Sequence, residues 1–80
     1  MVSRDQAYLV YKFLQTPQEV LVLAMTQMQP QVLNQFYRKL AIQLHPDKNR
    51  HPQATDAFQV VQAAMESAKT TMRTAYPGAF

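Results

Sequence analysis

The side chains best suited to chemistry lie close together in the sequence, in the segment His45-Pro46-Asp47-Lys48 and at His51. An imidazole near a carboxylate could serve acid–base catalysis or supply ligands to a metal ion. The sequence offers no nucleophile paired with a base, and no third and fourth ligand at the spacing of a zinc site. Cysteine is absent, which excludes thiolate sites and disulfides. We therefore expect no enzymatic activity, no metal ion and no cofactor.

The simplest structural interpretation of His45-Pro46-Asp47 is a turn that ends a helix, with a local hydrogen bond between His45 and Asp47. The preceding residues support the helix, because their apolar positions follow the spacing i, i+3, i+4, i+7, i+8 and i+11. These positions are Leu33, Phe36, Tyr37, Leu40, Ala41 and Leu44. The pattern predicts an amphipathic helix that starts near Pro30 and ends before Pro46, with Arg38 and Lys39 facing solvent.

Another amphipathic helix is predicted after the turn, beginning at Pro52 or Gln53. Its apolar stripe follows spacings of three and four, at Phe58, Val61, Met65, Ala68 and Met72. Two such helices joined by a short loop should pack antiparallel, with their apolar faces together. Phe58 should lie on the core side with an edge exposed near the loop. The methionines of the chain interior are expected to fill the core, at positions 25, 28, 65 and 72.

Two further helices are predicted ahead of this pair. The first should run from about Arg4 to Gln15, capped by Ser3 and Gln6, and it is apolar nearly all round. The best interpretation of Tyr8, Tyr11 and Phe13 is a docked aromatic core, and the alternative is an exposed patch for a second protein partner.

The second of these helices should begin at a capping box formed by Thr16-Pro17-Gln18-Glu19, with Pro17 at its first helical position. It should run to about Met28, where Gln29-Pro30 ends it.

Bulk composition narrows the class of protein. The chain has 80 residues, enough for one small domain, and a formal net charge of +3, which favours acidic partners weakly. Its longest apolar run, Ala7 to Leu14, is interrupted by Lys12 and is far shorter than the roughly 20 residues of a membrane span, so no membrane insertion is expected. No secretory signal is apparent. An intracellular reducing compartment, the cytosol or the nucleus, is the expected location.

With these elements in place, one segment resembles the second helix and HPD loop of J domains, the DnaJ-like module of co-chaperones. It reads Leu33-Asn34-Gln35-Phe36-Tyr37-Arg38-Lys39-Leu40-Ala41-Ile42-Gln43-Leu44-His45-Pro46-Asp47-Lys48-Asn49. The family pattern there is an aliphatic residue, then Tyr-Arg-Lys-Leu-Ala, then His-Pro-Asp-Lys-Asn at fixed spacing. The resemblance covers about Leu33 to Lys69 well, and Val20 to Met28 loosely as a counterpart of the family's first helix.

The resemblance implies a fold, a partner and a set of binding residues. The fold would be all-α: a J-domain-like antiparallel helical hairpin with an HPD loop, plus preceding helices. Residues 1–16 would form an extra N-terminal helix, 17–72 the J-like domain and 73–80 a short or frayed tail. The partner would be the ATPase domain of a heat shock protein 70 (DnaK-type) chaperone. Its binding residues would be Tyr37, Arg38, Lys39, His45, Pro46, Asp47, Lys48 and Asn49.

Within the family, the basic face of this helix meets an acidic surface of the chaperone, and the aspartate engages a basic residue there. By position, Arg38, Lys39 and Lys48 would dock, while His45, Pro46 and Asp47 would transmit the signal and Asn49 would support the loop. Departures from the pattern include Asn34 for a basic residue, Met65 for Tyr and Ala68 for Leu. Asn34, Met65 and the poorly matched first helix motivate an alternative, a J-like adaptor that has lost activation and binds another protein through the helix of Tyr8, Tyr11 and Phe13.

A small basic helical nucleic-acid binder is a less favoured alternative, because no aromatic platform interleaves with the basic residues. One observation bears on activation directly. If the N-terminal helix lies across Arg38 and Lys39, the module is self-inhibited or is no activator.

Overall fold

The structure, a computed structural model, describes residues 4–75 of the chain. Over this range the chain forms four helices and no strand: α1 (Arg4–Gln15), α2 (Gln18–Thr26), α3 (Pro30–Leu44) and α4 (Ala54–Ala75). The predicted all-α class is confirmed. No helix in this part of the chain is long and apolar enough to cross a membrane.

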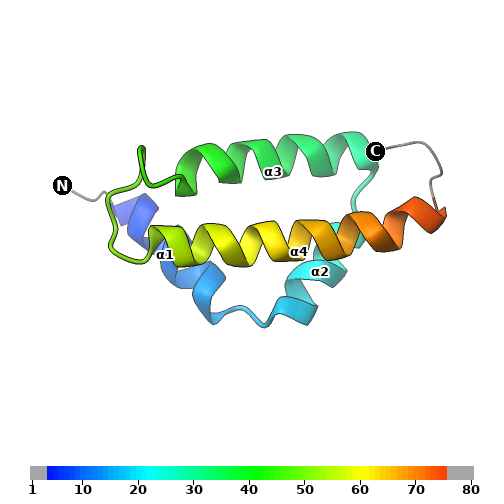
Figure 1. Ribbon diagram of the computed structural model, residues 1–80, viewed down its shortest axis with the longest axis horizontal. Coiled ribbons are helices and arrows are strands. Elements are labelled where there is room, and N and C mark those ends of the chain that lie inside the picture. Colours follow the sequence, from blue (N-terminus) through cyan, green and yellow to red (C-terminus); the bar gives the residue numbers. More distant parts are fainter. Residues whose placement is uncertain (1–3, 76–80) are drawn as a thin grey trace.

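Helices α3 and α4 run antiparallel and are joined by residues 45–53, which we call the His-Pro-Asp loop (Figure 1). The predicted hairpin is therefore present. α4 packs against each of the other three helices, with α3 along one side and α1 and α2 along the other (Figure 1). The first turn of α1 lies at the same end of the molecule as the His-Pro-Asp loop.

The core follows from this central position of α4. Its predicted stripe is confirmed, because Val61, Met65, Ala68 and Met72 are buried and Phe58 is half-buried. Three further residues of α4 are buried that the stripe did not include: Ala54, Ala57 and Ala64. A helix that contacts three neighbours needs a wider apolar sector than a two-helix contact, and alanines allow those neighbours to approach closely. Met25 is also fully buried and Met28 half-buried, which confirms the methionines as core filler.

Helix α3 agrees with its prediction at both ends and along its buried face. Pro30 occupies the first turn, where its missing N–H is no loss. Leu33, Leu40 and Leu44 are buried, and Phe36, Tyr37 and Ala41 pack half-buried against the core. The helix ends because His45, which precedes a proline, adopts an extended backbone with ψ 135°.

The capping box predicted for α2 is wrong. Pro17 is the N-cap residue and α2 begins at Gln18, without a side-chain hydrogen bond at the cap. The Thr16 hydroxyl instead donates to the Lys12 carbonyl at 2.7 Å, and the Thr16 N–H donates to the same oxygen at 3.0 Å. Because α1 ends at Gln15, immediately before Thr16, the nearest unsatisfied carbonyls belong to α1. Thr16 therefore closes the end of α1.

The prediction of an aromatic core on α1 is correct for Phe13 and wrong for the two tyrosines. Phe13 and Val10 are buried, whereas Tyr8 is 63% and Tyr11 61% exposed. Val10 and Phe13, three residues apart, form the face that packs against the hairpin, which leaves the tyrosines on the outer side. The Lys12 ammonium lies 6.0 Å from the centre of the Tyr8 ring, within cation–π range.

Two predictions concern the ends of the chain, the cap at Ser3 and the tail at residues 73–80. Ser3 of the first capping box lies outside the described residues. Helix α4 continues to Ala75, into the segment 73–80 expected as a tail, and the remainder of that segment also lies outside the described residues.

Candidate partner-binding site

The His-Pro-Asp loop begins with a tight turn built on the backbone of His45. The His45 N–H donates to the Ala41 carbonyl at 2.9 Å, which is the final bond of α3. The His45 carbonyl then accepts the N–H groups of Lys48 at 2.9 Å and Asn49 at 2.8 Å. Pro46 stiffens the intervening chain, since its ring fixes φ. The turn that ends the helix is thus a closed, hydrogen-bonded loop.

The His45 ring is fixed by two contacts. Its Nδ1 accepts the Asp47 N–H at 3.2 Å and lies 3.7 Å from the Asp47 Oδ2 atom. The ring also meets Phe58 of α4 edge-on, with centroids 5.8 Å apart and planes at 82°. Phe58 is half-buried near the loop, as expected, and its contact with His45 supports the loop from the opposite helix.

Asp47 and His45 remain open to a partner in spite of these contacts. The Asp47 side chain is 87% and the His45 side chain 51% exposed. Beside them, Ile42 of α3 is 57% exposed and helps to line an open hollow of about 330 Å³. The other residues of this hollow are Ala41, His45, Asp47 and Lys48. The loop end therefore presents an anionic and an imidazole group next to an apolar surface.

Asn49 is the buried polar residue of the site, at 1% exposure. Its side-chain amide donates to the carbonyl of Gln43 at 3.1 Å and to the carbonyl of Gln6 at 3.3 Å. Its Oδ1 accepts the His51 N–H at 2.9 Å. One side chain thus connects the last turn of α3, the first turn of α1 and the second half of the loop. No buried side-chain N or O in residues 4–75 lacks a hydrogen-bond partner.

Gln6 is the site residue that sequence reasoning missed. Its side-chain amide donates to the Lys48 carbonyl at 3.0 Å, and its carbonyl accepts the Asn49 amide. The sequence connected Gln6 with the cap of its own helix. A contact across more than 40 residues leaves no local signal, since it depends on how α1 packs on the hairpin.

The basic residues occupy exposed positions on α3 and on the loop. Arg38 and Lys39 lie on the solvent side of α3, as predicted, and Lys48 and Arg50 lie on the loop. Helix α1 packs against α3 and α4 without covering Arg38 or Lys39. The surface that self-inhibition would close is therefore open.

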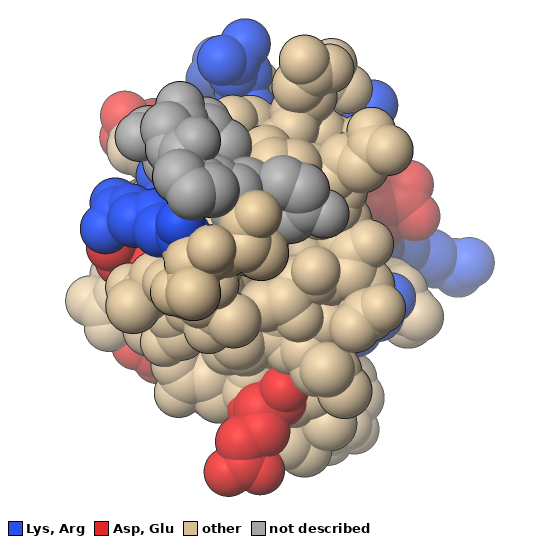
Figure 2. Space-filling view, turned by 90° about the vertical axis from the view of Figure 1, so that its right-hand side faces the viewer, with Lys and Arg blue, Asp and Glu red and all other residues tan. Residues whose placement is uncertain are grey.

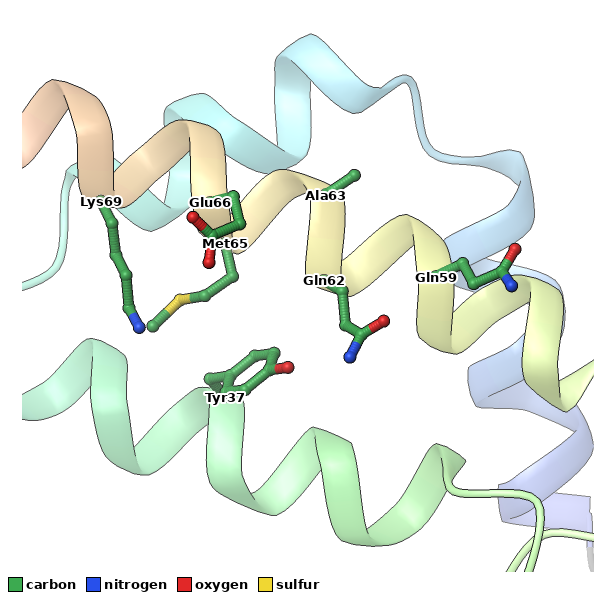
Figure 3. Close-up of a pocket in the computed structure, with 7 residues that line it drawn as sticks. All are labelled: Tyr37, Gln59, Gln62, Ala63, Met65, Glu66 and Lys69. Atoms are coloured by element: carbon green, nitrogen blue, oxygen red, sulfur yellow. The ribbon is translucent and has the colours of Figure 1, made fainter.

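Tyr37 is placed differently from the other predicted binding residues. It is half-buried and points toward α4, into a cleft of about 430 Å³ between the two helices (Figure 3). Polar and charged side chains of α4 line the other side: Gln59, Gln62, Glu66 and Lys69, together with Ala63 and Met65. The direct binding role of Tyr37 stays a prediction. In the structure its ring lies between α3 and α4.

His51 is engaged in the loop itself. Its Nδ1 accepts the Gln53 N–H at 3.1 Å, and its own N–H is bound to Asn49. Within residues 4–75, no group of three histidine or acidic side chains is arranged to hold a metal ion.

The sequence of this chain is similar to that of one known family. The family model described as the DnaJ domain matches residues 10–76, beginning within α1. Protein HLJ1 of Saccharomyces cerevisiae is 59% identical over 34 residues, a stretch that makes up 42% of this chain and 15% of HLJ1. DnaJ homolog subfamily C member 14 of Homo sapiens is 53% identical over 34 residues, or 42% of this chain and 5% of that protein.

DnaJ homolog subfamily B member 12 of Mus musculus is 53% identical over 32 residues, which are 40% of this chain and 8% of that protein. The matched stretch is thus a small part of each relative. No solved structure matches the chain significantly.

Proposed function

The chain belongs to the DnaJ domain family, and from this premise we propose that it is a co-chaperone that docks on a heat shock protein 70 (DnaK-type) chaperone and stimulates its ATP hydrolysis. Docking uses the basic side of α3, and the signal passes through the His-Pro-Asp loop. The observation that carries the proposal is the combination of an exposed Asp47 with a rigid loop backbone and an uncovered basic face.

Electrostatics supports the docking role of α3. Arg38 and Lys39 are exposed neighbours on one helix, with Lys48 nearby in the sequence on the loop. Charges at the rim of an interface accelerate encounter with a surface of opposite sign, and salt screens them. An acidic partner surface is therefore the natural complement, and no rearrangement of α1 is needed to reach it.

The loop geometry supports the signalling role. Hydrogen bonds hold the His45 backbone, while the Asp47 N–H and the Phe58 ring hold its imidazole, and the Asp47 carboxylate stays exposed. A loop that is ordered before binding loses less conformational entropy on docking. Asp47 can then meet a cationic side chain of the chaperone from a fixed position.

The departures from the family pattern fall mostly outside this surface. Met65 and Ala68 are buried in the core, so they change packing volume and leave the docking face unaltered. Asn34, by contrast, is exposed near the start of α3, away from the loop. The departures therefore remove one positive charge from the docking face of α3, at Asn34, and leave the His-Pro-Asp loop unchanged.

Single-turnover ATP hydrolysis by a DnaK-type chaperone tests the proposal. We expect the wild-type domain to accelerate hydrolysis and His45→Gln to remove the acceleration. Arg38→Ala should raise the domain concentration needed for half-maximal stimulation, and the matched control Arg73→Ala, an exposed arginine at the far end of α4, should not. Equal acceleration by wild type and His45→Gln would refute the activating role.

A second candidate function is favoured by the exposure of Tyr8 and Tyr11, which are each more than 60% exposed. In this alternative the domain is an adaptor that binds another protein through α1 and does not activate a chaperone. Exposed tyrosines are common anchors of protein interfaces. A bound protein that is lost with Tyr8→Ala or Tyr11→Ala and retained with Asp47→Asn would favour the adaptor.

A further inference from the structure

We propose that Gln6 is a positioning residue for the His-Pro-Asp loop, which makes the first turn of α1 part of the activating unit. The inference rests on the proposed function and extends it to a helix whose start precedes the residues matched by the family model. It is carried by two hydrogen bonds that join residues far apart in the sequence.

The two bonds place Gln6 directly against the loop backbone. Its side-chain Nε2 donates to the Lys48 carbonyl at 3.0 Å, and its main-chain carbonyl accepts the Asn49 amide at 3.3 Å. Lys48 and Asn49 are the same residues whose N–H groups close the turn on the His45 carbonyl. Gln6 therefore holds the outer side of the turn that displays His45 and Asp47.

Asn49 extends this clamp to α3. It is bonded at the same time to Gln6, to the Gln43 carbonyl in the last turn of α3 and to the His51 N–H. Since Asn49 is buried, losing one of these partners is not readily compensated by water. A change in the position of α1 would thus alter the hydrogen bonds of Asn49 to both α3 and His51.

The anchor of the clamp is itself fixed. Val10 and Phe13, one and two turns beyond Gln6, are buried against the hairpin. The exposed side chain of Asp47, on the other hand, has no burial to restrain it. Hydrogen bonds at the base of the loop therefore decide how much of the time Asp47 is correctly placed.

The clamp also predicts which step it affects. Two of the three docking residues, Arg38 and Lys39, lie on α3, outside the loop and uncovered by α1. Loosening the loop affects only the third, Lys48, so docking should stay nearly intact. The fraction of docked domains that transmit the signal should fall. Gln6→Ala removes the side-chain hydrogen bond to the Lys48 carbonyl, and Gln6→Glu keeps the length but replaces the donor with a carboxylate beside that carbonyl oxygen. The second change should be the stronger.

Amide hydrogen exchange followed by NMR gives a readout that needs no chaperone. In Gln6→Ala we expect the Lys48, Asn49 and His51 amides to exchange about threefold faster than in wild type, the effect of one ordinary hydrogen bond. Gln6→Glu should exceed this effect. The matched control is Gln15→Ala, an exposed glutamine at the other end of the same helix, which should leave the three amides unchanged.

The second readout is single-turnover ATP hydrolysis over a range of domain concentrations. We expect Gln6→Ala to lower maximal stimulation about threefold with little change in the half-saturating concentration, and Gln15→Ala to behave as wild type. Unchanged loop exchange, or an unchanged maximal rate, would overturn the proposal. If the wild-type domain gives no stimulation, the proposed function fails, and the exchange rates alone decide whether Gln6 clamps the loop.

Discussion

The two ends of the helical hairpin are stabilised in different ways. At the loop end, a buried asparagine and a set of backbone hydrogen bonds hold the chain, while His45 and Asp47 stay exposed. Toward the other end, α2 packs on α4 through apolar residues such as Leu21 and Met25. Figure 2 views that end and shows a largely uncharged surface with charged residues toward its edges.

The difference follows from what each end must present. A functional side chain cannot be fixed by burial and still meet a partner, so the loop is positioned through its backbone and directional bonds. At the α2 end the buried side chains Leu21 and Met25 supply the contact, which depends on volume and apolar area. Substitutions at the α2 end should therefore lower stability without disturbing the loop, whereas substitutions at the loop end should also loosen the loop.

The largest loss of stability is expected from Met25→Ala at the α2 end. Met25 is fully buried, so truncation should cost about 3 kcal/mol in the free energy of unfolding. Denaturant unfolding measures the loss, and the half-buried Met28→Ala should lose less. The amide resonances of Lys48 and Asn49 should stay where they are in wild type. A displacement of these resonances would break the separation of the two ends.

At the loop end, Asn49→Ala should cost about 2 kcal/mol in unfolding free energy, because three hydrogen bonds are lost and buried partners are left unpaired. Unlike Met25→Ala, this change should also accelerate amide exchange at His51. Asn34→Ala, an exposed asparagine on α3, is the matched control and should leave the unfolding midpoint unchanged. A loop that remains protected in Asn49→Ala would show that Asn49 is not its main support.

Phe58→Leu should have a smaller effect, about 1 kcal/mol in unfolding free energy, since it replaces an edge-on ring contact by an aliphatic one. The sharper readout is the NMR spectrum of the His45 ring, which lies 5.8 Å from the Phe58 ring centre. Its resonances should shift when the neighbouring ring current is removed. Unmoved His45 resonances would mean that α4 does not support the loop from this side.

The smallest effect on stability is expected on the docking face. Arg38 and Lys39 are exposed, so replacing either of them by alanine should leave the unfolding midpoint unchanged. Binding to the chaperone should weaken in both, and raising the salt concentration should reduce the difference from wild type. Arg73→Ala serves as the control. Binding that depends as strongly on Arg73 as on Arg38 would point to a diffuse charge effect and not to a docking face.

The sequence predicts the hairpin well because its signals are local. The apolar spacing from Leu33 to Leu44, with Pro30 and Pro46 at its ends, is sufficient to define α3 and to place His45 where the helix stops. The resemblance to J domains then supplies the candidate binding residues. The basic side chains and Asp47 are exposed, as a binding surface requires.

What the sequence could not predict depends on packing between distant segments. Ala54, Ala57 and Ala64 carry no strong hydrophobic signal, yet they are buried because α4 is surrounded by three helices. The exposure of Tyr8 and Tyr11 depends on which side of α1 meets the hairpin, since apolar residues lie on more than one side of this helix. Thr16 could serve either of two adjacent helices, and geometry assigned it to α1.

The central claim is that the exposed Asp47 on a rigid loop activates a chaperone, and Asp47→Asn tests it most directly. The substitution keeps the size of a side chain that is 87% exposed, so the helices should be unaffected, as circular dichroism can verify. Single-turnover ATP hydrolysis by a DnaK-type chaperone, at saturating domain, is the measurement. We expect acceleration by wild type and a rate near the unstimulated value with Asp47→Asn. Equal acceleration by both would rule out the activating role of Asp47.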